Sequence, residues 1–418
     1  MRNWNPIKRL SEPSKTCNIV NHNPQGPALT RGWALRLLID TMTSETKEPQ
    51  SSRLHTVMAT ADRLAGSVFI LPTVLALLFL SIFPLIASLY VSLARFKIAR
   101  GGFTLTFVGL DNYKKLFLGS EQTHFLGSFA PGTPVSWIIF GALVVALAIF
   151  LARYLLNARV SVGGLIGRIL LAVGLGGLTW MLVHTLWNGG RLGTVSITLV
   201  YVFAGIFFQY ILGLSLAMLT VQNLPGRRFF RVVFLLPMMI TPVGVAYMFR
   251  MLTDTSKGPF TPAWQALGLV DFSWVNNAWG ARTAILIADI WQWTPFMFIV
   301  LVAALESQPI EPLEAAVVDG ANSWQIFQHI TWPAILPVSM TLILIRLIEA
   351  FKIVDLPNVM TNGGPGTATQ SLTYHAFINW RALDLGASAA VAYMLLFLVT
   401  FFGMIFVNLI RQRTVESL

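Results

Sequence analysis

The stretch TVSITLVYVFAGIFFQYILGLSLAMLTV, residues 194–221, contains no charged side chain. A helix of about 20 apolar residues is long enough to cross the hydrocarbon core of a bilayer. Backbone N–H and C=O groups find no water there and must bond to one another within the segment, so the stretch is expected to be a membrane-spanning helix. It predicts the fold class: an all-α, polytopic bundle of transmembrane helices.

Working outward from this stretch, further apolar blocks of similar length occur on both sides of it. Eight blocks lie near residues 67–94, 134–157, 163–187, 194–221, 229–252, 282–304, 334–354 and 386–410. An even number of crossings puts both termini on one side of the membrane. Prolines inside the blocks are expected to kink or interrupt helices whose freed backbone groups neighbouring helices then satisfy; they are Pro72, Pro84, Pro237, Pro242 and Pro295.

The composition also indicates a membrane protein. Of the 418 residues, 55% are hydrophobic and only 11% are charged, against about 25% charged in an ordinary soluble domain. The formal net charge of +11 is dispersed over tails and loops, which favours anionic lipid headgroups over nucleic acid as the counterpart. The single cysteine, Cys17, permits no internal disulfide and no metal cluster.

Residues 1–66 are polar and irregular, and they are expected to form a disordered tail. Their length is wrong for a cleaved signal peptide, so the first span should stay in the mature chain. Because Met42 and Met58 lie inside this segment, part of it could precede the true start of the protein.

The segment between the sixth and seventh blocks, residues 305–333, is the most informative connection. From Glu306 to Pro333 it reads ESQPIEPLEAAVVDGANSWQIFQHITWP. A short helix is expected from about Glu311 to Asp319, ended by Gly320, which can take the left-handed conformation of a helix terminus. Asn322 and Gln325 then resemble a capping box that opens a second helix. In that helix Ile326, Phe327 and Ile330 are expected to share one face, and Pro333 is expected to begin the next span.

This acidic loop, as we call residues 305–333, could be an amphipathic hairpin that rests on lipid headgroups. Such hairpins are usually basic. The stretch from Glu306 to Pro333 has no Lys or Arg and contains four carboxylates: Glu306, Glu311, Glu314 and Asp319. A protein partner is therefore the better explanation.

The same residues resemble the EAA loop of the permease subunits of ABC importers. The match consists of Glu314-Ala315-Ala316, then Gly320, then Ile330 and Pro333, while Trp332 stands where the family usually has Leu. The resemblance implies that the loop is cytoplasmic, with both termini, and that it docks in a cleft of an ATPase. The coupling residues it implies are Glu314, Ala315, Ala316, Asp319, Gly320, Ala321, Ile330 and Pro333.

The resemblance covers residues 67–118 and 194–410. Further segments resemble those of one group within the family, the maltose-type carbohydrate permeases. These segments are Phe107–Tyr113, Gly226–Arg231 with Leu236-Pro237, Trp291–Phe296 and Thr361–Gly366. The chain is thus divided into a tail (1–66), a first core span with its outer loop (67–118), two added spans (119–193), the core permease domain (194–410) and a cytoplasmic tail (411–418). Arg168 and His184, in the added spans, are expected to be packing residues.

The energy source is expected to lie in another subunit. The chain has no G-x-x-x-x-G-K-[ST] phosphate loop, no H-E-x-x-H and no G-x-S-x-G. We therefore expect a permease that is not itself an enzyme and holds no cofactor, with ATP and Mg in the partner ATPase.

Ionisable residues inside spans are costly and usually line a transport pathway. The seventh block contains Arg346, Glu349 and Lys352, with Asp355 at its outer end. At about 1.5 Å per residue, Asp289 and Gln292 of the sixth block lie at depths similar to those of Glu349 and Arg346. An alternative is that the charges only neutralise one another along the helix.

Asp289, Gln292 and Phe296 share a helix face, and indole rings can cover the apolar faces of a sugar. In the family that the chain resembles, the stretches matching Asp289–Phe296 and Glu349–Asn358 contact sugar. The predicted pathway residues are Asp289, Trp291, Gln292, Trp293, Phe296, Arg346, Glu349, Lys352, Asp355 and Asn358.

The expected function is that of a permease subunit of an ATP-driven, binding-protein-dependent importer of a carbohydrate or polyol, in the plasma (inner) membrane of a bacterium. Its expected partners are a cytoplasmic ATPase dimer, a second permease subunit, an extracytoplasmic solute-binding protein and the bilayer. An ion-coupled secondary transporter would also explain buried charges and broken helices. A membrane enzyme or a non-transporting receptor is disfavoured by the missing catalytic motifs and by the polar groups at matching depth.

Overall fold

Most of the described chain is helical. The computed structural model describes residues 70–99, 102–129, 131–156, 162–186, 191–222, 225–268 and 274–416. The predicted tail 1–66, with Cys17, Met42 and Met58, lies outside the described residues. The chain divides into two units, one ending at Ala87 and the other beginning at Ser88.

The described part of the first unit is helical from Ile70. A π-helical turn, η2 (Leu78–Ile82), precedes α3 (Phe83–Ser92). In η2 the amide of Phe83 bonds to the carbonyl of Leu78. Because Pro84 has no N–H to continue the regular pattern, this wider turn falls where the proline was expected to distort the helix.

Seven helices of the described residues are long and apolar enough to cross a membrane, which confirms the predicted fold class. They are Ile70–Ser92, α6 (Pro134–Leu155), Gly167–Leu186 within α7 (Val162–Leu186), α8 (Thr194–Val221), α12 (Ala278–Glu306), Ser323–Ala350, and Leu385–Asn408 within α17 (Leu385–Glu416). Ser323–Ala350 consists of α14 (Ser323–Ile326), the π turn η3 (Phe327–Thr331) and α15 (Trp332–Ala350).

The predicted block 229–252 is not one straight helix. It consists of α9 (Arg227–Met239) and α10 (Pro242–Leu252), which meet at an angle of 96°. Thr241 is extended because the ring of the following Pro242 disfavours the helical conformation, and its hydroxyl then caps α10 at the Gly244 amide, 3.3 Å away. Counted as one broken span, the pair brings the crossings to eight.

Short elements complete the described chain. Two antiparallel ladders pair β1 (Ala94–Ala99) with β2 (Gly102–Phe107), in the register Ala94 to Phe107, and β3 (Gly127–Ser128) with β4 (Arg191–Leu192). The remaining helices are α4 (Asp111–Leu118), α5 (Gln122–Phe125), α11 (Thr261–Ala266), α13 (Glu311–Val318), the π turn η4 (Pro357–Thr361) and α16 (Leu372–Arg381).

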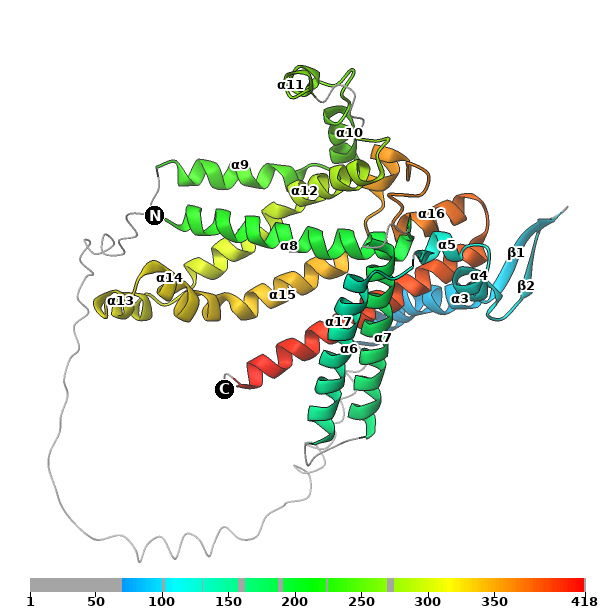
Figure 1. Ribbon diagram of the computed structural model, residues 1–418, viewed down its shortest axis with the longest axis horizontal. Coiled ribbons are helices and arrows are strands. Elements are labelled where there is room, and N and C mark those ends of the chain that lie inside the picture. Colours follow the sequence, from blue (N-terminus) through cyan, green and yellow to red (C-terminus); the bar gives the residue numbers. More distant parts are fainter. Residues whose placement is uncertain are drawn as a thin grey trace, which may run out of the picture. The chain divides into compact units, whose positions relative to one another are not determined.

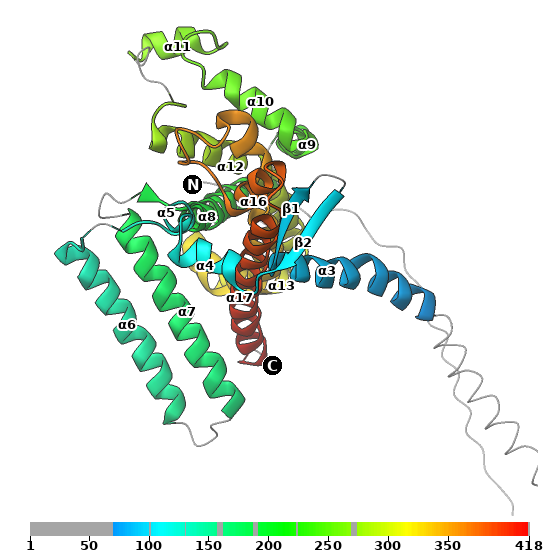
Figure 2. The ribbon, with the colours of Figure 1, turned by 90° about the vertical axis from the view of Figure 1, so that its right-hand side faces the viewer.

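The core of the second unit lies where α8, α12 and α15 pack against one another (Figure 1). Its fully buried side chains include Val202, Met297, Phe298, Leu301 and Leu342. The pair α6 and α7 lies side by side (Figure 2), and α7 also contacts α8. We call the ends of these helices near Val221, Glu306 and Ser323 the loop end, and the opposite ends, near Thr194 and Ala278, the far end.

A polar cluster at the far end, with buried and half-buried members, joins α5 to α8 and α16. His375 is 1% exposed, and its Nε2 lies 3.3 Å from Glu121 Oε2 while its Nδ1 lies 3.5 Å from Thr194 Oγ1. The ring of His124 lies 4.2 Å from that of His375, centre to centre, and its Nε2 lies 2.6 Å from Gln370 Oε1. We call these five residues the far-end cluster.

Candidate functional site

The acidic loop joins the loop-end termini of two long helices. It begins where α12 ends at Glu306, continues through α13, and enters the helix Ser323–Ala350. Pro333 lies in the first turn of α15, as predicted for the start of a span, but the helix that follows the glycine turn runs into α15 without a break. The π turn η3 makes this possible: Trp332 N–H bonds to the Phe327 carbonyl, so the pattern has already widened where Pro333 offers no donor.

The predicted turn at Gly320 is confirmed. Gly320 has φ +78°, in the left-handed region. The Ala321 amide donates to the Ala316 carbonyl at 2.9 Å, and the Gly320 amide donates to the Val317 carbonyl at 3.1 Å. These two bonds form a Schellman motif, which satisfies carbonyl groups that the end of α13 leaves free.

The capping box predicted at the start of the next helix is also present. The Gln325 amide donates to Asn322 Oδ1 at 2.9 Å, and the Asn322 amide donates to Gln325 Oε1 at 2.8 Å. Together with the glycine turn, this box fixes the angle between α13 and the helix Ser323–Ala350.

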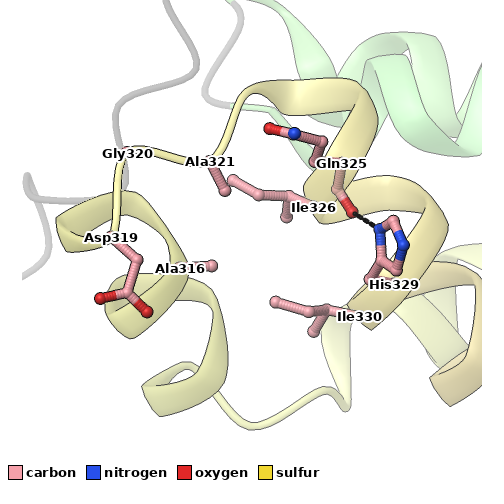
Figure 3. A pocket seen from close by; sticks show the side chains of 8 residues that line it. All are labelled: Ala316, Asp319, Gly320, Ala321, Gln325, Ile326, His329 and Ile330. Carbon is pink, nitrogen blue, oxygen red and sulfur yellow. Dashed lines mark hydrogen bonds between the residues drawn. The ribbon is translucent and has the colours of Figure 1, made fainter.

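A hollow of about 360 Å³ lies inside the bend of the acidic loop (Figure 3). It is lined from both arms of the loop, by which we mean α13 and the helix that begins at Ser323; the lining residues are Ala316, Asp319, Gly320, Ala321, Gln325, Ile326, His329 and Ile330. Ile326 and Ile330 both line it and so share a face, as predicted, but Phe327 packs against Trp324 and Trp332 instead, with ring centres 5.5 and 6.1 Å apart. Trp332 in turn meets Tyr210 of α8 at 6.2 Å, so this departure from the family pattern is accommodated by an aromatic contact with the core.

The outer surface of the acidic loop combines carboxylates with exposed apolar side chains. Val318 is 86% exposed and Trp324 is 67% exposed, while Glu311 and Asp319 are exposed and Glu314 is half-buried. Large apolar side chains that face outward beside charges are typical of a surface that another protein covers.

Arg231 connects α9 to Glu306, near the start of the acidic loop. Its Nη2 donates to the carbonyl of Thr220, at the end of α8, at 3.0 Å, and also to the carboxylate of Glu306. The loop ends of α8, α9 and α12 are thereby held together by one guanidinium group.

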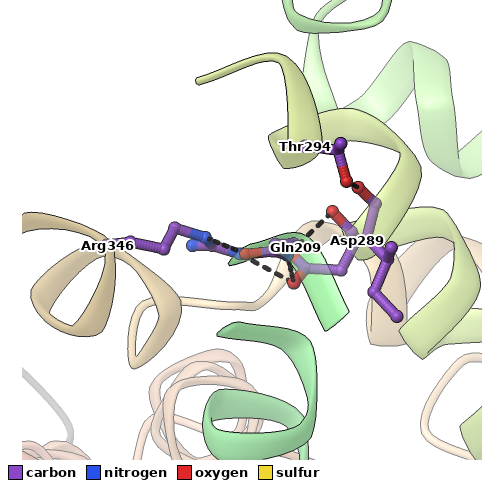
Figure 4. A network of polar contacts seen from close by, with 5 residues as sticks. Gln209, Asp289, Thr294 and Arg346 are labelled. Atoms are coloured by element: carbon purple, nitrogen blue, oxygen red, sulfur yellow. Dashed lines mark hydrogen bonds and ion pairs between the residues drawn. The ribbon is translucent and has the colours of Figure 1, made fainter. Parts of the chain in front are cut away.

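A second group of polar residues lies deep in the core, between α8, α12 and α15 (Figure 4). Nη2 of Arg346 lies 2.8 and 2.7 Å from the two carboxylate oxygens of Asp289, and its Nε donates to Gln209 Oε1 at 2.9 Å. Gln209 Nε2 donates to Asp289 Oδ2 at 2.9 Å and to the Asp289 carbonyl at 3.1 Å. The guanidinium also lies 4.5 Å from the ring centre of Trp293. We call Gln209, Asp289 and Arg346 the buried triad.

The structure brings Asp289 and Arg346 into direct contact, whereas the sequence predicted only that they lie at similar depths. Their polar atoms face one another rather than open space, and the two side chains are 7% and 1% exposed. Helix packing tolerates a charge pair closed in this way because each charge is paired and hydrogen-bonded. Its assignment to a solute pathway stays a prediction.

The other predicted pathway residues are distributed differently. Gln292 is buried, and its Nε2 donates at 3.3 Å to the carbonyl of Ile240, which the break between α9 and α10 leaves free. Glu349 pairs with Lys352 at 2.8 Å on the partly exposed side of α15, so one neutralising pair along the helix does form. Lys352 lies just beyond the end of α15 at Ala350. The remaining members are half-buried: Trp291, Trp293, Phe296, Asp355 and Asn358.

Sequence reasoning missed Gln209 and Arg231. Gln209 is the one amide side chain in the uncharged stretch 194–221, and a strongly polar group in such a span is costly unless it is paired. That signal could have found Gln209 but not its partners, since they come from helices distant in sequence. Arg231 belongs to the family segment Gly226–Arg231, but nothing in that segment indicates its partners.

Comparison with known proteins places the chain among transport proteins. Residues 209–416 match the model of the family described as binding-protein-dependent transport system inner membrane component. The trehalose/maltose transport system permease protein MalF of Thermococcus litoralis is 33% identical over 217 residues, which are 52% of this chain and 74% of that relative. The probable starch degradation products transport system permease protein AmyD of Thermoanaerobacterium thermosulfurigenes is 28% identical over 239 residues, 55% and 77% of the two chains.

The fold is similar to that of a solved bacterial alginate ABC transporter in complex with an alginate pentasaccharide-bound periplasmic protein, with a TM-score of 0.55 and 16% identity. The match covers 84% of this chain and 96% of that one.

Proposed function

Since this chain belongs to the family of binding-protein-dependent transport system inner membrane components, we propose that it forms the membrane path of an ATP-driven importer for a carbohydrate or polyol. The chain is a multi-pass membrane protein, and in the proposed arrangement the loop end and both termini face the cytoplasm of a bacterium. Two similar permeases carry trehalose, maltose or starch degradation products in their names, which supports this substrate class.

The observation that carries the proposal is the outer surface of the acidic loop. Its carboxylates and exposed apolar side chains fit a cleft of a partner protein that offers basic groups and an apolar floor. The partner that we propose is a cytoplasmic ATPase dimer, which supplies ATP and Mg and performs the hydrolysis. A second permease subunit and an extracytoplasmic solute-binding protein would complete the importer.

The geometry also suggests how the motion of such a partner reaches the core. Both arms of the acidic loop lead directly into helices of the buried triad. Asp289 lies roughly 25 Å from Glu306 along α12, and Arg346 lies roughly 35 Å from Ser323 along the other helix. Because the ion pair joins these two helices in the core, and Arg231 holds α9 to Glu306, the loop and the helices that flank it are expected to move together.

Glu314→Lys tests the proposal directly. The substitution reverses the charge of a half-buried carboxylate on α13. A carboxylate makes charge-assisted hydrogen bonds of about 1.5–3 kcal/mol each with a basic cleft, and a lysine there is repelled. The expected result is an inserted, folded permease that no longer retains its ATPase or couples ATP hydrolysis to uptake.

The measurement is co-purification of the ATPase with tagged permease, together with solute uptake into vesicles that contain ATP. Glu311→Lys, which reverses a more exposed carboxylate of the same helix, is the matched comparison and should have a smaller effect. If Glu314→Lys retains the ATPase and transports normally, the docking surface is misassigned. If uptake by the unaltered protein runs on an ion gradient without ATP, the chain is a secondary transporter.

A further inference from the structure

A second hollow, of about 340 Å³, lies between α7 and α17, next to α4, α5 and the start of α8. Its walls are entirely aromatic and aliphatic side chains, methionines and glycines. They include Phe125 of α5, Gly177 and Trp180 of α7, and Phe397 and Phe401 of α17. Without a charged side chain in its lining, an apolar hollow of this kind does not hold water stably.

Two glycines of α7 shape the hollow. A Cβ atom at Gly174 would lie 2.6 Å from the ring of Phe401, so α7 can approach α17 closely at this point only without a side chain. A Cβ atom at Gly177, one helical turn further on, would meet nothing within 4 Å. The two helices therefore touch at Gly174 and leave space beside Gly177.

The hollow opens toward the bilayer. Val173 and Phe397, both in its lining, are 69% and 60% exposed, and α7 and α17 are both helices able to cross a membrane. Counted along α7 from Leu186, the lining from Trp180 to Val173 lies roughly 9–20 Å deep. Counted along α17 from Leu385, the lining from Met394 to Phe401 lies roughly 14–24 Å deep. Both ranges fall inside a hydrocarbon core about 30 Å thick.

The size of the hollow limits its occupant. One turn of an α-helix, about 10 Å wide and 5.4 Å long, occupies roughly 400 Å³. A transmembrane helix of a partner subunit is therefore too thick to enter, whereas a hydrocarbon chain is thin and flexible. An empty space would leave the aromatic rings around it without dispersion contacts on one side.

We propose that this hollow binds one acyl chain of a membrane phospholipid. The chain enters between Val173 and Phe397 and packs against Trp180 and Phe401, so that lipid completes the contact between α7 and the core. The inference requires only that these helices lie in a membrane, and it is independent of the solute, the ATPase and the direction of transport.

Photolabelling tests it. The full-length protein, with the subunits that accompany it, is placed in vesicles of phosphatidylethanolamine that carries a diazirine group in the middle of one acyl chain. After irradiation, labelled positions are mapped by mass spectrometry. Adducts are expected to concentrate on residues 173–181 and 394–401, well above the lipid-facing surface of α6, whose Val145 and Ile149 are 58% and 51% exposed.

Two leucine variants of α7 separate a bound chain from ordinary surrounding lipid. Gly177→Leu fills the hollow and should reduce the concentrated labelling several-fold. Gly176→Leu places the same side chain one residue away, where a Cβ also meets nothing within 4 Å but which is not part of the lining, and should leave the labelling unchanged.

Equal labelling of α6 and of the hollow in the unaltered protein would overturn the proposal, and this result does not depend on any variant folding. So would labelling that Gly177→Leu does not reduce. Because solute uptake is not the readout, failure of this experiment is distinguishable from failure of the proposed function.

Discussion

At the scale of single residues, the buried triad is the most demanding feature of the core. Arg346 and Asp289 are almost fully buried, and Gln209 supplies both a donor and an acceptor between them. Removing one partner of such a pair leaves a charge with no compensation, at a cost of about 3–5 kcal/mol. In the Glu349–Lys352 pair the side-chain nitrogen and oxygen lie 2.8 Å apart, but the two side chains are 41% and 60% exposed. Exposed ion pairs of this kind contribute about 0–1 kcal/mol to stability.

Arg346→Gln is therefore expected to lower the thermal unfolding midpoint in detergent strongly, and Lys352→Gln to change it little. The double variant Asp289→Leu with Arg346→Met should recover much of the loss, because no unpaired charge remains. Unfolding midpoints of the purified variants provide the measurement. Equal shifts for Arg346→Gln and Lys352→Gln would contradict the structural role of the triad.

The same double variant also tests the predicted solute pathway. If its unfolding midpoint is close to that of the unaltered protein but its uptake is lost, the pair has a role in transport beyond holding α12 to α15. If the double variant keeps both its unfolding midpoint and its solute uptake, the pair serves helix packing alone.

At the scale of elements, the acidic loop depends on one left-handed residue. The φ of +78° at Gly320 is what lets α13 end and the chain reverse toward Ser323. A Cβ atom there would meet nothing within 4 Å, so backbone conformation rather than space restricts this position. The left-handed conformation costs an ordinary residue about 1–2 kcal/mol, and more for a β-branched one, whereas Asn tolerates it.

Gly320→Val should consequently misplace α13 while the spans still insert. The expected result is loss of ATPase co-purification and of uptake at a normal level of membrane-inserted protein. Gly320→Asn is the control and should keep most of both activities. Normal uptake by the valine variant would show that this turn does not position a docking surface.

At the scale of the whole molecule, the far-end cluster ties elements from distant parts of the sequence to one another. It joins α5 to the start of α8, to α16 and to Gln370, with Phe125 packed against the ring of His375. Burial lowers the pKa of His124, and the nearby His375 lowers it further as the second-largest cause. Contact with His375 holds the pKa of the Glu121 carboxyl below its ordinary value, with smaller contributions from His124 and Lys115.

Stability should therefore fall as the pH falls. An unfolded histidine titrates near pH 6.5, and the folded His124 binds its proton less readily, so below about pH 6.5 the unfolded state holds more protons and is favoured. The Glu121 carboxylate adds a loss of the same sign only below about pH 4.3, where the unfolded carboxyl begins to bind a proton.

The unfolding midpoint, measured from about pH 7.5 to about pH 5.5, should decrease on acidification. In His124→Gln, whose amide keeps a hydrogen-bonding partner for Gln370, the decrease should be smaller. An identical pH profile in the variant would show that His124 does not govern it.

The sequence by itself determined which segments cross the membrane and where the acidic loop turns. In a bilayer, an uncharged stretch such as 194–221 can satisfy its backbone hydrogen bonds within the segment only as a helix. Gly320, Asn322 and Gln325 shape the loop through hydrogen bonds with residues close to them in sequence. Such local causes can be recognised without knowing the rest of the fold.

Only the tertiary structure decided which polar groups meet. Depth along two helices placed Asp289 and Arg346 at one level, but rotation and packing determined that they face each other, that Gln209 joins them and that Glu349 turns to Lys352 instead. The partner of Gln292 and the hollow beside Gly177 likewise depend on how separate helices approach one another, whereas the break at Thr241 follows from the neighbouring Pro242. The sequence pattern of one helix does not predict where the next helix lies, because side-chain packing over the whole interface sets that position.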